Sequence, residues 1–180
     1  MTVVLITGNP GAGKSELARE LRRLGYATLD GDDIAHYETA EGLPAGEPPT
    51  EMTDEWLHDH RWVWGRAAVA AATAGHRSNE GHFFLCGIAM DQDELLDLID
   101  VVFLLSIDEQ TQVRRLDTPS NAGRNAAQRR QIIDGRPVFE QQVRALGAVV
   151  LDGASPTSLL AARVLQELEV RFPPRTAAGR

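Results

Sequence analysis

The stretch Gly8-Asn9-Pro10-Gly11-Ala12-Gly13-Lys14-Ser15 decides the fold of this chain. It matches the spacing G-x-x-x-x-G-K-[ST], in which glycines let the backbone turn so that several N–H groups face one concavity and hold phosphate oxygens. The lysine of such a loop reaches the outer phosphates, and the hydroxyl that follows it ligates Mg²⁺. The stretch therefore predicts a site for the phosphates of a nucleoside triphosphate, which we expect to be ATP with Mg²⁺.

The residues on either side of the loop support this interpretation. Thr2–Thr7 is a run rich in β-branched residues, as expected of a strand buried on both faces of a parallel sheet. A helix is predicted over 14–24, with three leucines on one face (Leu17, Leu21 and Leu24), and Gly25 suits its left-handed cap. A helix that begins directly after the loop points its positive dipole end at the bound phosphates.

Composition narrows the class of protein. The chain has 180 residues and a formal net charge of −8, so we expect one domain and neither a nucleic-acid nor a membrane partner. Cys86 is the only cysteine, so no intrachain disulfide can form. Without a basic leader segment or an apolar run of ~18 residues, we expect a cytoplasmic protein. Of the 18 basic residues only Lys14 is a lysine, which marks that position as chemically special.

Short apolar strands alternate with helical segments along the rest of the chain. Further strands are predicted at Tyr26–Leu29, Phe83–Cys86, Val101–Ile107 and Ala148–Leu151. Helices are predicted over 53–74 (broken near Gly65), after an Asp91/Glu94 capping box, after an Asp108 cap, over 125–146, and from Ser155-Pro156 to about Val170. This alternation predicts an α/β fold of three layers, with helices on both faces of a five-stranded parallel sheet. Ligands of such sheets bind at the carboxyl ends of the strands.

Three carboxylates follow the second predicted strand, at Asp30, Asp32 and Asp33. Beside a phosphate site they would repel the ligand unless a metal or a proton transfer requires them, and phosphoryl transfer requires both. One carboxylate can orient an acceptor hydroxyl and take its proton, and another can hold Mg²⁺. Asp is also common in turns and helix caps, so Asp33 could simply cap a helix that begins near Ile34.

The phosphate loop, the segment Leu29-Asp30-Gly31-Asp32 and the arginines described next resemble the P-loop small-molecule kinases. That family includes adenylylsulfate, gluconate, shikimate and nucleoside monophosphate kinases and chloramphenicol phosphotransferase. The resemblance implies a P-loop NTPase fold with strand order 2-3-1-4-5, ATP as donor and a small-molecule hydroxyl as acceptor. It implies that Asp32 meets that hydroxyl. From the residues themselves we expect Lys14 on the phosphates, and Ser15 with Asp30 toward Mg²⁺, directly or through water. The third strand ends at Cys86-Gly87 without the Asp or Arg of several nucleotide kinases, so the acceptor does not follow from the family.

The resemblance also implies a lid after the fourth strand, at about residues 115–128, whose arginines stabilise the transferred group and exclude water. Five arginines lie in or near this segment: Arg114, Arg115, Arg124, Arg129 and Arg130. Arg115 and Arg124 flank its loop and are the preferred lid residues, although an arginine-rich helix by itself is more often a solvated face. The loop after the fifth strand, with Asp152, is implied to contact the nucleotide.

An insertion between the second and third strands, at about residues 34–75, contains all three tryptophans of the chain, Trp56, Trp62 and Trp64. In the family this region forms the acceptor pocket, and these rings with Arg61, His58 and His60 could line it. The tryptophans could equally pack the segment against the sheet. His58 and His60 lie two residues apart and would diverge on a helix, which argues against a shared metal. We expect a single domain over 1–172 and a tail over 173–180, and the sequence does not give the oligomeric state.

The sequence also bears on two other nucleotide-dependent functions. A GTPase needs an Asn-Lys-x-Asp motif, which a chain with a single lysine at position 14 cannot contain. A P-loop ATPase or nucleotide-gated binding module would use Asp108 to hold Mg²⁺ and Glu109 to activate water. The same pair suits a helix cap and a first-turn acid. We therefore expect an ATP-dependent phosphotransferase that acts on a hydroxyl of a small molecule.

Overall fold

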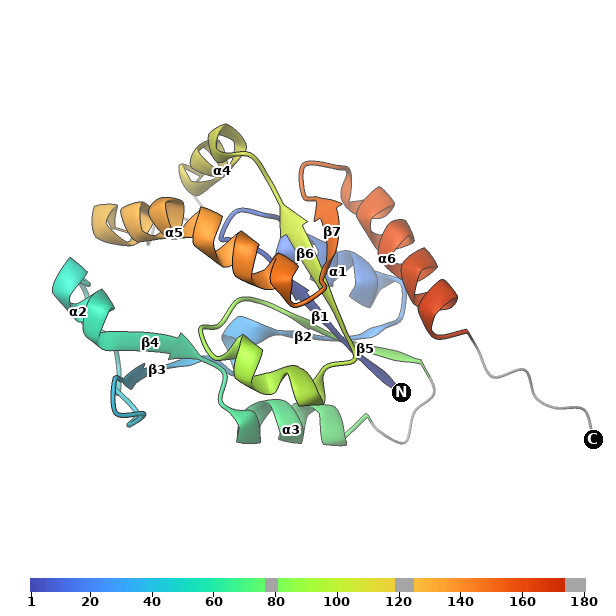
Figure 1. Cartoon of the computed structure of the whole chain (residues 1–180), viewed down its shortest axis with the longest axis horizontal. Helices are drawn as coiled ribbons and strands as arrows, with labels where there is room; N and C mark the ends of the chain where they lie inside the picture. Colours follow the sequence, from blue (N-terminus) through green and yellow to red (C-terminus); the bar gives the residue numbers. More distant parts are fainter. Residues whose placement is uncertain (77–80, 119–124, 174–180) are drawn as a thin grey trace, which may run out of the picture.

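Five parallel strands form the central sheet of the computed structural model, which describes residues 1–76, 81–118 and 125–173 (Figure 1). The strands are β1 (Thr2–Thr7), β2 (Ala27–Asp30), β5 (His82–Cys86), β6 (Val101–Ser106) and β7 (Val149–Asp152). They lie in the order β2-β5-β1-β6-β7, which is 2-3-1-4-5 when only these parallel strands are counted. The predicted fold class is confirmed.

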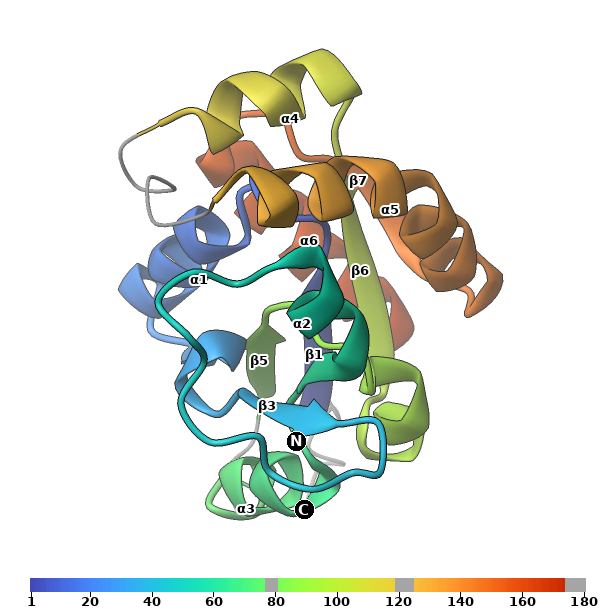
Figure 2. The ribbon, with the colours of Figure 1, turned by 90° about the vertical axis from the view of Figure 1, so that its left-hand side faces the viewer.

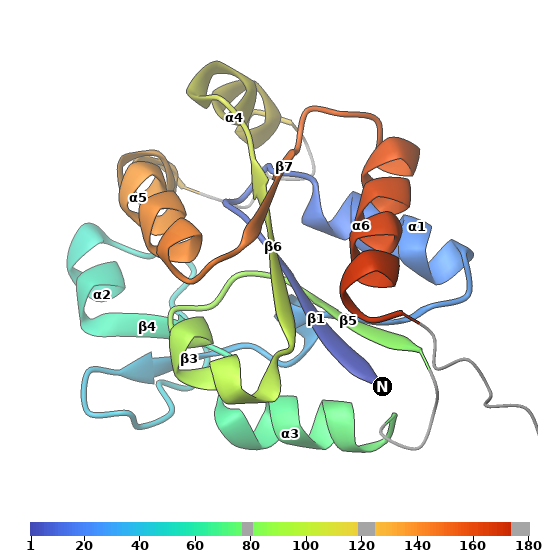
Figure 3. The same ribbon diagram turned by 45° about the vertical axis from the view of Figure 1, so that its right-hand side comes forward.

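The alternation of side chains along β1 creates the three layers. Val4 and Ile6 belong to a core shared with α1 (Lys14–Arg23) and α6 (Thr157–Arg171). Val3 and Leu5 point to the opposite face, because successive side chains of a strand alternate. That face is covered by α3 (Arg66–Ala74), the 3₁₀ segment η2 (Gln92–Leu98) and α5 (Ala126–Ala145). Figure 3 shows the two helical layers on either side of the sheet.

The acceptor-side insertion differs from its prediction. The helix expected over 53–74 is instead α2 (Asp54–Asp59), β4 (His60–Val63) and α3. Gly65, with φ of 74°, separates β4 from α3. Strand β4 pairs antiparallel with β3 (His36–Thr39), so that Tyr37 lies opposite Trp62. Figure 2 shows β3 at the front of the molecule, below α2. The helix expected near Ile34 is also absent, because the 3₁₀ turn η1 (Gly31–Asp33) leads into β3.

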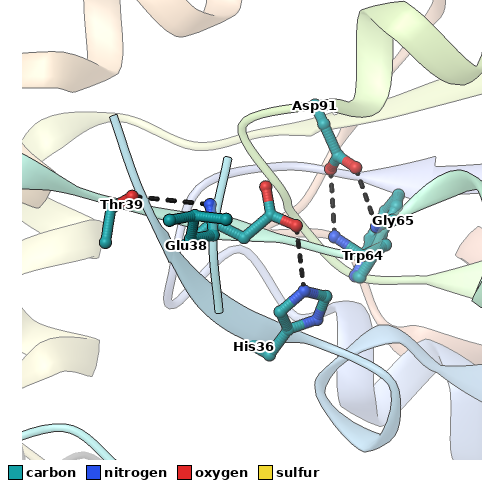
Figure 4. A network of polar contacts seen from close by, with 7 residues as sticks. His36, Glu38, Thr39, Trp64, Gly65 and Asp91 are labelled. Carbon is teal, nitrogen blue, oxygen red and sulfur yellow. Dashed lines mark hydrogen bonds and ion pairs between the residues drawn. The ribbon is translucent and has the colours of Figure 1, made fainter. Parts of the chain in front are cut away.

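Asp91 does not cap a helix as predicted. Its side chain makes no cap hydrogen bond to η2, and its buried carboxylate accepts from the backbone N–H groups of Trp64, at 3.0 Å, and Gly65, at 2.8 Å (Figure 4). A carboxylate with two backbone donors forms strong, charge-assisted hydrogen bonds. Asp91 therefore fastens the junction of β4 and α3 to the segment that follows β5.

Several predicted helix ends are confirmed and others shift. Gly25 has a φ of 91°, and the Asp108 side chain accepts from Thr111 N at 2.8 Å at the start of α4 (Glu109–Leu116). Leu24, in contrast, is 44% exposed, whereas Leu17 and Leu21 are buried in the core. Helix α6 begins at Thr157, one residue after Pro156. Helix α5 begins with a capping box between Asn125 and Gln128.

Within the described part of the chain, no helix has the length and apolar character needed to cross a membrane.

Trp64 supports the strand ends that carry the acidic residues. It is fully buried, and its ring lies directly beneath two glycines. A Cβ on Gly31 would stand 2.7 Å from Trp64 Nε1, and one on Gly87 would stand 2.8 Å from Trp64 Cζ2. Both positions must therefore lack a side chain if the ring is to fill this space. Gly31 lies between Asp30 and Asp32, so the ring packs against the turn that carries those carboxylates.

Replacing Gly31 with Ala should therefore destabilise the protein. The new methyl would overlap the Trp64 ring, and overpacking of a tight core site costs about 1–3 kcal/mol. Gly75→Ala is the matched control, because a Cβ at Gly75 meets nothing within 4 Å and the residue has a right-handed backbone. Urea unfolding of both variants measures the difference. Equal midpoints for Gly31→Ala and Gly75→Ala would contradict the proposed role of Trp64.

Candidate active site

The phosphate loop lies between β1 and α1, where a side chain at position 8 or a right-handed backbone at position 13 would not fit. A Cβ on Gly8 would stand 2.5 Å from the carbonyl oxygen of Leu105, and Gly13, with φ of 102°, is the N-cap of α1. The first backbone hydrogen bond of the helix runs from Leu17 N to Gly13 O. The N–H groups of the first turn precede that bond and have no carbonyl within the helix. This is the arrangement that binds anions at a helix N-terminus.

The Lys14 ammonium lies over this loop. Its Nζ donates to Gly8 O at 2.6 Å and to Asn9 O at 3.1 Å. These carbonyls hold the charge at the mouth of the loop. The lysine therefore lies where it can reach the phosphates of a bound nucleotide.

A cavity of about 920 Å³ joins the phosphate loop to the acidic residues after β2. Its lining includes Lys14, Ser15, Asp30, Asp32 and Arg115, so the structure brings together most of the predicted site residues. The remaining loop residues follow the same turn, with Pro10, Gly11 and Gly13 on the cavity wall and Ala12 and Asn9 buried beneath it.

Asp152 does not line this cavity. Its carboxylate accepts from Ala154 N at 2.9 Å and Ser155 Oγ at 3.2 Å, which shapes the turn after β7. Its neighbours Gly153 and Ser155 line the cavity instead. The loop contributes to the wall through these residues, while a direct contact of Asp152 with the nucleotide stays a prediction.

The carboxylates after β2 are fixed by local structure. Asp30 Oδ1 accepts from Asp32 N at 3.2 Å and so caps η1, which leaves both residues on the cavity wall. Asp33 is not among the residues that line the cavity. Cys86 pairs with Asp30 across the sheet, and burial, reinforced by the charge of Asp30, raises the pKa of its thiol to about 12. The thiol is therefore protonated near neutral pH and offers no nucleophile to the site.

Ser15 and Asp30 provide a donor set that fits Mg²⁺. A hydroxyl and a carboxylate oxygen at one cavity wall are the oxygen ligands that this ion takes together with water and substrate phosphates. The described residues contain no group of three or more His, Cys, Asp or Glu side chains that could hold a metal by themselves. The Ser15 and Asp30 oxygens agree with a Mg²⁺ site that the protein would share with the phosphates of a nucleotide.

Helix α4 holds the phosphate loop from the opposite side. Arg115 Nη1 donates to Gly11 O at 2.9 Å and to Gly153 O at 3.1 Å, which ties the loop to the segment after β7. Gln112, fully buried, donates from Nε2 to Pro10 O at 3.2 Å. Gln112 could not be recognised as a loop contact from the sequence, because a lone glutamine on a helix gives no signal of a tertiary backbone contact.

The other predicted lid arginines differ in their surroundings. Arg124 lies outside the described residues. Arg129 pairs with Asp117 at 2.7 Å, and Arg130 pairs with Asp54 at 3.1 Å. Arg114 donates to the hydroxyl of Thr111 at 2.9 Å. Of the five, Arg115 is the one described arginine on the cavity wall.

The three tryptophans have three different environments. Trp62 lines the cavity with Tyr37, and their ring centroids are 4.8 Å apart. Trp64 packs in the core. Trp56 stacks on His60 at 4.1 Å, and His60 Nδ1 lies 2.7 Å from Trp56 O. His58 borders a smaller neighbouring pocket.

The Asp108–Glu109 pair has structural partners. The Thr111 backbone N–H, followed by its hydroxyl, holds the pKa of the Asp108 carboxyl below its usual range. Glu109 pairs with Arg136 at 3.1 Å, and neither acid lines the cavity. These contacts favour the cap interpretation over a hydrolytic pair.

No protein-family model matches the chain. Dephospho-CoA kinase from Thermobifida fusca (strain YX) is 27% identical over 194 residues, covering 94% of this chain and 96% of that protein. Dephospho-CoA kinase from Bordetella avium (strain 197N) is 26% identical over 184 residues, covering 88% and 85%. Among solved structures, shikimate kinase from Acinetobacter baumannii in complex with shikimate superposes with a TM-score of 0.62 at 17% identity, covering 96% of each chain.

The structural likeness concerns the fold, while the sequence similarity spans nearly the whole of both relatives. Both agree with the phosphate loop and the cavity described above. Together they support an ATP-dependent kinase, and the chain resembles the P-loop small-molecule kinases in sequence and in fold.

Proposed function

We propose that the chain transfers the γ-phosphoryl group of ATP to a hydroxyl of a small molecule, with Mg²⁺. The observation that carries this proposal is the single cavity that the phosphate loop, Asp32, Tyr37 and Trp62 all line. A nucleotide on the loop and an acceptor against the rings would meet between Lys14 and Asp32. A hydrolase has no need for the second half of this cavity.

The phosphate loop would hold the nucleotide in one position. Backbone N–H groups at the start of α1 and the Lys14 ammonium would bind the phosphate oxygens, and their charge would stabilise the group in flight. Arg115, anchored to Gly11 O, keeps the loop in register with the wall at Gly153. Ser15 and Asp30 would hold Mg²⁺, which supplies neutralising charge to the phosphates when bound.

Asp32 would prepare the acceptor. A carboxylate near the γ-phosphate can accept a hydrogen bond from the attacking hydroxyl, hold it in line and take its proton as the new O–P bond forms. The backbone around Asp32 is held from below by Trp64 and from the side by Asp30. Its side chain is therefore presented on a rigid turn. Asp30 is the alternative base, since it lies on the same wall.

Lys14→Ala should weaken ATP binding. Loss of a charge-assisted contact to the phosphates costs about 1.5–3 kcal/mol, which is tenfold or more in affinity. Arg23→Ala is the matched control, since it removes one positive charge from the same helix where the arginine pairs with Glu20. Nucleotide titration of both variants checks this. Equal affinities, with both proteins folded, would overturn the assignment of the phosphate loop.

Asp32→Asn should lower phosphoryl transfer by about 10²–10⁴-fold, the usual contribution of a general base. The amide keeps the shape and can hydrogen-bond, but it cannot take the proton, so ATP affinity should survive. Asp33→Asn is the control, because it removes the neighbouring carboxylate, which does not line the cavity. Single-turnover transfer to the best acceptor from an ATP-consumption screen is the measurement. Transfer within a few-fold of wild type in Asp32→Asn would leave Asp30 as the candidate base.

Arg115→Ala should lower kcat at least tenfold while changing the KM for ATP less, because a group that acts on the transferring charge is used mainly in the transition state. Arg114→Ala provides the comparison, since this residue lies on the same helix and contacts Thr111. Steady-state kinetics with ATP varied distinguishes the two. A kcat near wild type in Arg115→Ala would limit the role of this arginine to the loop contacts already seen.

A further inference from the structure

The cavity has two ends of different charge. Six charged side chains line it: Lys14, Glu16, Arg19, Asp30, Asp32 and Arg115. The phosphate loop and α1 supply three of them and α4 supplies Arg115, where the nucleotide is expected. The turn at the end of β2 supplies Asp30 and Asp32, where the acceptor hydroxyl is expected. The far end, here called the acceptor end, is lined by Tyr37, Leu57, Trp62, Gln128, Gln131 and Ile132. None of these six side chains is charged.

Arginines that flank the acceptor-end residues in sequence are paired with carboxylates. Arg130 pairs with Asp54 at 3.1 Å and borders the smaller neighbouring pocket rather than the cavity. Arg61 pairs with Glu94 at 3.0 Å. Among the described residues, therefore, an acidic group bound at the acceptor end would find no cation on the wall around it. Burying an unpaired charge is costly, so this end disfavours an anion.

The acceptor end instead offers an aromatic surface that exists before any ligand binds. Tyr37 and Trp62 are cross-strand partners in the β3–β4 hairpin, with their rings tilted by 56°. Tyr37 also packs edge-on against Trp56 at 4.7 Å. The Tyr37 hydroxyl lies 3.6 Å from the sulfur of Met52. The same sulfur accepts a hydrogen bond from Gln128 Nε2 at 3.3 Å. These contacts fix the rings, so little side-chain entropy is lost when a flat group packs on them.

We propose that the acceptor is an uncharged alcohol that carries a flat ring, which is the chemistry of a nucleoside. This inference rests on the proposed kinase function and adds the class of acceptor. The ring packs against Tyr37 and Trp62, the amide of Gln131 can donate to and accept from polar ring atoms, and the hydroxyl reaches Asp32. Dephospho-CoA, for which the two sequence relatives are named, carries an anionic diphosphate, so the proposal separates this chain from them in substrate.

The test is a set of acceptors in charged and uncharged pairs, assayed for kcat/KM at saturating MgATP. The pairs are nucleosides with their 5′-monophosphates and hexoses with their phosphates, and dephospho-CoA is included. We expect a nucleoside to be the best acceptor, ahead of its own monophosphate by tenfold or more. If dephospho-CoA, a monophosphate or a ring-free polyol is best, the acceptor class is wrong while the kinase function stands. If ATP is hydrolysed and nothing is phosphorylated, both proposals fail.

Two variants test the residues that carry the inference. Trp62→Leu should raise the KM of the ring-bearing acceptor about threefold to tenfold, the size of an aromatic packing contact, and leave the KM for ATP unchanged. Tyr26→Leu is the control, because Tyr26 packs on Phe84 and does not line the cavity. Gln131→Arg should improve the monophosphate relative to its nucleoside severalfold by supplying the missing cation. An unchanged preference in Gln131→Arg, or equal effects of Trp62→Leu and Tyr26→Leu, would overturn the proposal.

Discussion

The position of β1 in the middle of the sheet is the constraint on which the other features depend. The strand is hydrogen-bonded by β5 on one side and β6 on the other, and its side chains are buried on both faces. The two neighbouring strands therefore hold the end of β1 at Thr7 in place, and the phosphate loop begins at this fixed point. Leu105 O lies so close to Gly8 that even a Cβ would not fit between them, so the loop has no room to collapse on this side. A preformed concavity of N–H groups costs no reorganisation when charge develops on a transferred group.

A second set of contacts attaches the acceptor side of the cavity to the central sheet. Trp64 fills the space under Gly31 and Gly87, and Asp91 ties the Trp64 backbone to the segment after β5. The β3–β4 hairpin extends from that point, and α5 reaches it through Asn125 Nδ2, which donates to Met52 O at 2.6 Å. The rings of the acceptor end are thus attached, through Trp64 and Asp91, to the central sheet that carries the phosphate loop. Two substrates can be held at a fixed separation because both halves of the cavity are built on that sheet.

The sequence was informative where the signal is local. The loop at 8–15, the five parallel strands and the Asp108 cap follow from short patterns, and the structure has them. The β3–β4 hairpin could not be predicted in this way, since its pairing depends on Tyr37 meeting Trp62 across a long connection. Asp91 has the pattern of a helix cap, but two distant backbone N–H groups compete for its carboxylate and bind it. Local preference was overridden by tertiary contacts at both places.

A kinase passes the γ-phosphoryl group of ATP to an organic hydroxyl and not to water. Phosphorus NMR of a reaction with the purified protein, MgATP and the best acceptor measures this directly, because a phosphate ester and inorganic phosphate give separate signals. We expect that an ester appears in step with ADP and that inorganic phosphate stays at background. Release of ADP with inorganic phosphate alone, at the same rate with and without an acceptor, would contradict it.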